Sequence, residues 1–168
     1  MTLSMHQASA QRFVAILTNL SAILDKAQAH VDAKKIDPQA LLGARLFPDM
    51  LPMVRQVQIA CDSAKGGVAR LAGVEIPKHD DTEQSFADLK ARIAKTIAFI
   101  QTLAPAQIDG TEDKEIVMKL GQNEVRFKGQ QFLLGFAIPN VYFHVTTAYS
   151  ILRHNGVEIG KRDFLGAM

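Results

Sequence analysis

The sequence predicts a mainly α-helical fold, an up-down-type four-helix bundle with a small β-hairpin inserted before the last helix. Four long segments carry apolar residues at spacings of three and four, which is the period of one helix face. A shorter segment near residue 120 alternates in the manner of β-strands. Hydrophobic residues make up 48% and charged residues 21% of the 168 residues, so four helices can share one buried core. We therefore expect a single domain spanning residues 1–168.

The first long helix is expected to begin at Ser4, because Ser4 and Gln7 have the spacing of a capping box. Its apolar stripe fades at Lys34–Lys35, where positive charge suits the C-terminus of a helix. Asp37 then predicts the cap of a short helix that has Pro38 at its first position and runs through Leu42.

The second long helix should follow a stop at Phe47–Asp49 and end at Gly73. The Gly66–Gly67 pair near its end is interpreted as a place of close helix approach or of fraying. Its apolar residues have the heptad spacing of a helix in an antiparallel bundle: Met50, Val54, Val57, Cys61, Ala64, Val68 and Leu71.

The third helix is predicted to start in the polar stretch Asp81–Gln84 and to run to about Leu103, ahead of Pro105. The period then changes from helical to alternating. We expect a hairpin with strands at Glu115–Leu120 and Glu124–Lys128, which needs the bundle or a second subunit to pack against because two strands alone are marginally stable.

The fourth helix is predicted at Gln130–His154, ended by Asn155 and Gly156. Its apolar residues cover nearly every face, which is typical of a helix that is central or shared with a partner. Pro139 should kink it, because proline lacks a backbone donor and crowds the preceding turn. The tail from Val157 onward is expected to be irregular and anchored by Phe164 and Leu165.

His144 is the first candidate for chemistry. It shares a helix face with Asn140, one turn away, among apolar neighbours of the fourth helix. One interpretation is a metal ligand or general base inside the bundle. The other is a buried histidine that is satisfied by one hydrogen bond, with Asn140 as its neighbour.

Asp49 and Gln56 complete the candidate interior polar cluster, because they are seven residues apart on the second helix and can share one face. Asp49 is also interpreted as a helix cap. Asp62 is expected to be solvated, and Cys61 to behave as a small buried hydrophobe. The other histidines are expected at the surface: His6, His30, His79 and His154.

Composition excludes several classes of protein. The net charge is +2 and no basic run exceeds two residues, so we expect no nucleic-acid binding. A single Cys61 excludes an internal disulfide and a multi-cysteine zinc site. The sequence has neither an apolar stretch long enough to span a membrane nor a signal-peptide pattern. We therefore expect a soluble, cytoplasmic domain.

The stretch FHVTTAYSILRHNGVEIGKRDFLG, residues 143–166, resembles a bacterial family catalogued as domain of unknown function 1993. The Pro48–Met50 and Gln56–Val57 segments and the start at Met5 are similar to it as well. That family is grouped with the DinB-like (YfiT-like) four-helix bundles, many of which are regarded as metalloenzymes and are often dimers. The resemblance implies this fold and, in its typical members, a metal bound by one histidine of the second helix and an H-x-x-x-H pair of the last helix.

Carried over to this chain, the resemblance matches His144 with the last histidine of the pair and places Asn140 at its partner position. The second helix contains no histidine. Asp49, Gln56 or Asn140 could bind through oxygen, but amide oxygens are weak ligands for zinc or nickel. We therefore expect no metal and no other cofactor.

Two functions follow from these patterns. The first is a metal-free DinB-like bundle that binds a small molecule or a protein partner. The second is a metal-assisted or acid/base enzyme with an interior site around His144 and Asn140. In either case we expect a homodimer, because the fourth helix, the hairpin and the tail all need covering surface.

Overall fold

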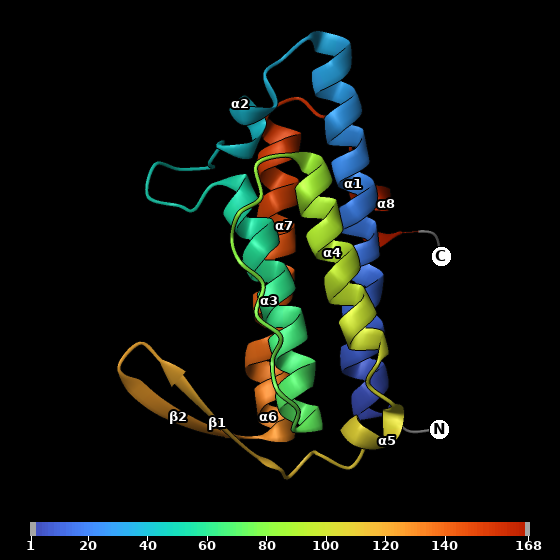
Figure 1. Ribbon diagram of the computed structural model, residues 1–168, viewed down its shortest axis with the longest axis vertical. Helices are drawn as coiled ribbons and strands as arrows, with labels where there is room; N and C mark the ends of the chain where they lie inside the picture. Colours follow the sequence, from blue (N-terminus) through green and yellow to red (C-terminus); the bar gives the residue numbers. More distant parts are fainter. Residues whose placement is uncertain (1–2, 167–168) are drawn as a thin grey trace.

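The computed structural model describes residues 3–166 as a four-helix bundle with a hairpin at one end, so the fold class predicted from the sequence is confirmed (Figure 1). The hairpin precedes the last helix, as expected. The elements are η1 (Gln7–Gln11, a π-helical turn), α1 (Arg12–Lys34), α2 (Pro38–Leu42), α3 (Met53–Ala72), α4 (Phe86–Gln101), α5 (Pro105–Ile108), β1 (Glu115–Leu120), β2 (Asn123–Lys128), α6 (Gly129–Phe132), η2 (Leu133–Ala137, a second π-helical turn), α7 (Ile138–His154) and α8 (Lys161–Leu165).

The long helices form a ring in which α1 and α3 are diagonal and each of them contacts both α4 and α7. Helices α1 and α7 run in one direction and α3 and α4 in the other, so the order is up, down, down, up (Figure 1). The reason is the connection at residues 73–85, which returns along the whole of α3 before α4 begins (Figure 1). The directions therefore do not alternate strictly.

Local capping chemistry sets several helix ends as predicted. Ser4 Oγ accepts the Gln7 N–H at 3.2 Å, and Gln7 Oε1 accepts the Ser4 N–H at 3.2 Å, so the capping box is present. Lys35 ends α1 in the left-handed region with φ 54°, and Gly73 ends α3 with φ 74°. Asp37 caps α2 by accepting the Gln39 N–H at 2.9 Å.

Two helices start later than predicted. Helix α3 begins at Met53 and not at Met50. Leu51 precedes Pro52, and the residue before a proline avoids the helical region, so no helix passes through this point. Helix α4 begins after Ser85, whose Oγ accepts the Asp88 N–H at 3.1 Å.

The two glycines of α3 are positions of close contact, and the helix shows no fraying there, since it continues to Ala72. A Cβ at Gly67 would lie 3.2 Å from Phe13 and 3.3 Å from Ala137. A Cβ at Gly66 would lie 2.7 Å from the Nη1 atom of Arg70. Gly67 thus lets neighbouring helices approach α3, and Gly66 makes a seat for a guanidinium group.

The hairpin packs on its own bundle. The strands pair in antiparallel register, with Leu120 opposite Asn123, and Gly121 adopts φ 62° in the two-residue loop. The Phe127 ring lies 6.0 Å from Phe132 and 5.9 Å from Phe136, centroid to centroid, so an aromatic cluster attaches the hairpin to the start of the last helix.

The last helix differs from the prediction in two respects. The disturbance expected at Pro139 takes the form of the π-helical turn η2 just before it, which accommodates the missing proline donor. The helix is also not covered on every side. An outer stripe containing Pro139, Phe143 and Thr146 is exposed, with 58% of Phe143 accessible.

The tail is helical, whereas an irregular segment was expected. Helix α8 packs against α1, where Asn19 Nδ2 donates to the Phe164 carbonyl at 3.0 Å and Lys26 pairs with Asp163 at 2.6 Å. Phe164 is the anchor that was predicted, because its ring packs against two tyrosines of α7, but Leu165 remains exposed.

Candidate functional site

The bundle joins two of the four predicted site residues directly. His144 Nδ1 on α7 lies 2.7 Å from Gln56 Oε1 on α3. Gln56 is only 2% exposed, and its Nε2 donates to the Leu51 carbonyl at 2.9 Å. The amide is therefore held at both ends, between the loop that precedes α3 and the last helix.

This arrangement determines which nitrogen of His144 carries the proton. Because the Gln56 Nε2 atom donates to Leu51, its Oε1 atom is the acceptor that faces the ring, and Nδ1 must carry the hydrogen. Burial lowers the pKa of His144 below its ordinary value of 6.5, so the ring is neutral at pH 7. Its Nε2 atom then has a lone pair with which to accept a proton or a hydrogen bond.

The other two predicted site residues have different surroundings. Asn140 Nδ2 donates to the Phe136 carbonyl of its own helix at 2.7 Å. Asp49 is exposed in the turn that is closed by the Met50 N–H and the Phe47 carbonyl at 3.0 Å. Asp49 does not cap α3, because Pro52 occupies the N-cap position.

The donor set does not fit the metal centre that the DinB-like fold implies. That centre needs three strong ligands from two helices. Here His144 can offer its Nε2 atom, since Nδ1 is engaged by Gln56, but Asn140 offers an amide oxygen, which is a weak ligand for zinc or nickel. Among residues 3–166, no three histidine, cysteine, aspartate or glutamate side chains gather closely enough to hold a metal ion.

A second polar cluster, which we call the ionic clamp, lies beneath the 73–85 connection and consists of Asp62, Lys65, Asp81, Glu83 and Arg92 (residues 62 and 65 on α3, 92 on α4). The Arg92 side chain is 2% exposed and contacts three carboxylates, at 2.9 Å to Asp62, 3.0 Å to Asp81 and 2.9 Å to Glu83. Lys65 also reaches Asp62, at 2.7 Å. The clamp ties the connection to both helices that it crosses.

The charges of the clamp stabilise one another. Burial alone would raise the pKa of Glu83, but hydrogen bonds from Arg92 and Gln58 hold that pKa below its ordinary value. The pKa of Asp81 is lowered by its hydrogen bond from Arg55 and by the charge of Arg92. Glu83 and Asp81 are therefore ionised at neutral pH.

Sequence reasoning missed the clamp. Asp62 is solvated in part, as expected, with 42% of its side chain exposed, but its contacts with Lys65 and Arg92 were not predicted. His79 was expected at the surface, but it is half-buried, with both ring nitrogens out of contact with solvent. One signal was available: Arg92 stands within the apolar stripe of its helix, three residues after Leu89 and one before Ile93, where a charge needs a buried partner.

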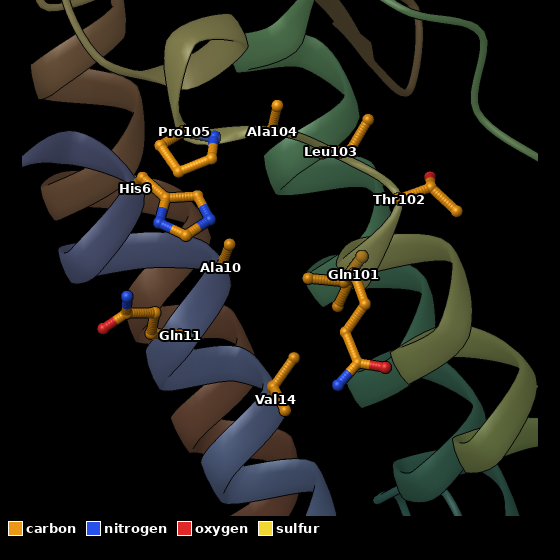
Figure 2. A pocket seen from close by; sticks show the side chains of 10 residues that line it. His6, Ala10, Gln11, Val14, Gln101, Thr102, Leu103, Ala104 and Pro105 are labelled. Atoms are coloured by element: carbon orange, nitrogen blue, oxygen red, sulfur yellow. The ribbon is translucent and has the colours of Figure 1, made fainter.

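A groove opens between the start of α1 and the end of α4 (Figure 2). Its volume is about 520 Å³. In Figure 2, His6 faces Pro105 at one end, and Val14 and Gln101 project toward each other farther along. The π-helical turn η1 forms part of the wall, and the His6 N–H donates to Asp109 at 2.8 Å, which ties α5 to this end of the groove.

Cys61 is fully buried, as predicted. Burial raises the pKa of its thiol to about 12, so the thiolate that a nucleophile requires does not form near neutral pH. No helix within residues 3–166 combines the length and the apolar character needed to cross a membrane.

Comparison with known proteins gives one family and a close structural relative. No curated protein matches this sequence. The crystal structure of a DinB family member protein from Shewanella denitrificans matches with a TM-score of 0.92 and 46% sequence identity, over 97% of this chain and 92% of that chain. The family described as "Domain of unknown function (DUF1993)" matches residues 5–165. Because that match covers nearly the whole sequence, the chain belongs to the DUF1993 family, and its fold is that of the DinB-like bundles.

Proposed function

We propose that this protein is a binding bundle that works without a catalytic metal, and that its ligand is a small, mainly apolar molecule held in the groove of Figure 2. The observation that carries the proposal is the groove itself. At about 520 Å³ it has the size of typical small-molecule sites, and its walls are largely apolar with a few polar groups.

The residues of the groove indicate the chemistry of the ligand. Ala10, Val14, Ile100 and Leu103 supply apolar contact, so a hydrocarbon or aromatic body is favoured. His6 projects into one end, where its ring can exchange a hydrogen bond with a hydroxyl or carbonyl group (Figure 2). Among the described residues that line the groove there is no aspartate, glutamate, lysine or arginine, so a neutral ligand is expected.

The test uses the neutral fluorescent dye N-phenyl-1-naphthylamine as a probe of the groove. The wild-type protein should bind it saturably, with one site per chain. Val14→Phe, which places a ring in the groove, should abolish that binding. Ala22→Phe serves as the matched control, because residue 22 is exposed on the same helix and outside the groove. Equal binding by Val14→Phe and wild type would contradict the proposal.

A second candidate function is acid/base catalysis at His144. It is favoured by one observation, the hydrogen bond from Nδ1 to Gln56, which orients a neutral imidazole and leaves Nε2 able to take a proton. Metal analysis of protein purified without a histidine tag separates a metal-assisted form of this function from the binding bundle. Stoichiometric zinc, nickel or iron would favour the enzyme, and less than about a tenth of an equivalent would favour the bundle.

We also propose that the protein is a homodimer. The support is exposed apolar surface on the last helix, where Leu134 is 55% and Phe143 is 58% accessible, and a twofold contact is the commonest way for such a surface to cover itself. Light scattering at micromolar concentration should give twice 18.4 kDa. A mass near 18.4 kDa that persists at high concentration would rule the dimer out.

We propose a cytoplasmic location for this bundle. The support is Cys61, a lone thiol without a disulfide partner, which is typical of a reducing compartment. Fractionation of cells that produce the untagged protein would test this, with recovery in the cytoplasmic fraction as the expected result.

A further inference from the structure

A small cleft lies between α3 and the start of the last helix, away from both the His144–Gln56 pair and the groove of Figure 2. Its volume is about 210 Å³, which corresponds to about seven waters. We call it the Arg70 cleft. It is lined by Ser63 and Arg70 of α3, Met118 of β1, and Phe132 and Phe136 of the last helix.

Arg70 is a half-buried cation without an acidic partner. Among residues 3–166, no carboxylate lies within 4.0 Å of its guanidinium, although other partly buried arginines of the bundle, such as Arg55 and Arg92, are paired. Its Nη1 atom donates to the Gly66 carbonyl at 3.0 Å, which uses one of the five guanidinium hydrogens. Burial lowers the pKa of Arg70, as expected for a cation that lacks a counter-charge.

The position of this guanidinium group depends on the space that Gly66 of α3 leaves. A side chain at Gly66 would place its Cβ 2.7 Å from Arg70 Nη1, so only glycine leaves room for the group in this position. The head of Arg70 is therefore held over the backbone of α3 on the side that carries Ser63 and Gly67, where the cleft opens.

The opposite wall of the cleft is aromatic. The rings of Phe132 and Phe136 stack with centroids 5.8 Å apart and an interplanar angle of 23°, and Met118 borders them from the hairpin. Asp62 also lines the cleft, but Lys65 and Arg92 neutralise its carboxylate at 2.7 and 2.9 Å. An anion that enters the cleft therefore meets the charge of Arg70 without facing an uncompensated carboxylate.

We propose that the Arg70 cleft binds the carboxylate of a small acid with an aromatic or aliphatic body. The guanidinium of Arg70 pairs with the carboxylate through two parallel hydrogen bonds, and the body of the acid packs on Phe132, Phe136 and Met118. A cleft of about 210 Å³ has room for a molecule of the size of benzoate. This site is independent of the groove and goes beyond the function proposed above.

The experiment is a titration of the full-length protein with sodium benzoate at constant ionic strength, observed by NMR at the Met118 methyl group and the Arg70 Nε–H group. Both signals should shift together and saturate by about 20 mM, as the binding energy available to so small a ligand allows. Benzyl alcohol, which has the ring without the charge, and sulfate, which has charge without the ring, should each bind at least about tenfold more weakly.

Three variants locate the site. Arg70→Gln should weaken benzoate binding about tenfold or more, and Arg70→Lys should have an intermediate effect, because lysine keeps the charge and loses the paired geometry. Arg12→Gln is the matched control, since residue 12 is an exposed arginine outside the cleft. Thermal unfolding of each variant shows that the bundle remains folded.

Several results would overturn the proposal. The first is that the Met118 and Arg70 signals of the wild-type protein do not respond to benzoate. The second is that the Arg70→Gln variant binds benzoate with an affinity within twofold of wild type. The third is that sulfate binds as tightly as benzoate. If Arg70 served only the C-terminal turn of α3, its variants would lower the unfolding temperature and leave the benzoate titration unchanged, which also contradicts the proposal.

Discussion

Replacing Arg92 by methionine should be one of the most destabilising single changes in this protein. The Arg92 side chain is 2% exposed, and methionine fills a similar volume without any charge. Its removal leaves Glu83, whose side chain is 9% exposed, as a buried carboxylate that keeps its bond from Gln58 Nε2 at 2.6 Å but no longer has the cation beside it.

The expected magnitude follows from the burial of the pair. Breaking a buried ion pair by removing one partner costs about 3–5 kcal/mol, because an uncompensated charge stays behind. A domain of this length loses about 2–4 °C of unfolding temperature per kcal/mol. Arg92→Met should therefore lower the melting temperature by about 6–20 °C.

The matched control is Arg126→Met. Arg126 also contacts two carboxylates, Glu115 at 3.2 Å and Glu124 at 2.7 Å, but its side chain is 59% exposed. Exposed pairs contribute little to stability, so this variant should melt within about 4 °C of wild type. The double variant Arg92→Met/Glu83→Gln should recover part of the loss, because it removes the stranded charge.

Acid titration gives a second measurement on the same cluster. The pKa values of Asp81 and Glu83 lie below their ordinary values of 3.8 and 4.5 in the folded protein. As the pH falls, the unfolded chain takes up protons first, so the stability from these groups is complete above about pH 4.5 and is lost below it. In Arg92→Met this acid-dependent loss should be smaller.

The reasoning would be refuted if Arg92→Met and Arg126→Met melted at the same temperature. It would also fail if wild type and Arg92→Met lost stability equally between neutral pH and pH 3. The contacts of Arg92 with ionised carboxylates would then make no contribution to stability. Calorimetry of the four proteins over this pH range supplies both comparisons.

Three further predictions concern single positions. His144 should titrate below its ordinary pKa of 6.5 in an NMR experiment, so its contribution to stability should be present above that pH and be lost as the pH falls. Gly67→Val should lower the free energy of unfolding in urea by about 1–3 kcal/mol, because the new side chain overlaps two neighbours. Gly66→Ala displaces only the flexible guanidinium group of Arg70, so it should lower that free energy by less than about 1 kcal/mol. Cys61 should not react with a thiol reagent at pH 8 until denaturant is added, because its thiol is buried and its pKa is about 12.

The parts of the fold that depend on neighbouring residues were predictable from the sequence. The Ser4–Gln7 capping box, the helix stop at Gly73 and the hairpin around Gly121 each arise within a few residues. The stripes of apolar residues then specify how many helices must pack together. Because the four-helix bundle is confirmed, these local patterns were sufficient to predict the fold class.

The start of α4 required information that is not local. Asp81 and Ser85 are both capping residue types, and the sequence offers no preference between them. Asp81 pairs with Arg55 and Arg92, which lie 26 and 11 positions away in the chain, so its carboxylate is engaged in the clamp, and Ser85 caps the helix instead.

The candidate site was predictable as a set of residues but not as a set of contacts. His144 and Gln56 are 88 positions apart, and only the packing of α3 against α7 brings Nδ1 and Oε1 together. Asn140 was placed on the same helix face, but its amide is used by the Phe136 carbonyl next to the π-helical turn. A π-helical turn has no reliable sequence pattern, so this use of Asn140 could not be foreseen.

The π-helical turn η2 also lets the last helix tolerate a change of length. Such a turn holds one residue more than an α-helical turn of the same rise, so deletion of the exposed Gly135 would convert Leu133–Ala137 to ordinary α-helix. The residues on either side would keep their faces, because the extra residue is absorbed within that one turn. The contact between the rings of Phe127 and Phe132 should therefore survive the deletion. Relatives of this protein that lack one residue at this place should have a continuous α-helix there and carry the hairpin on the same side of the bundle.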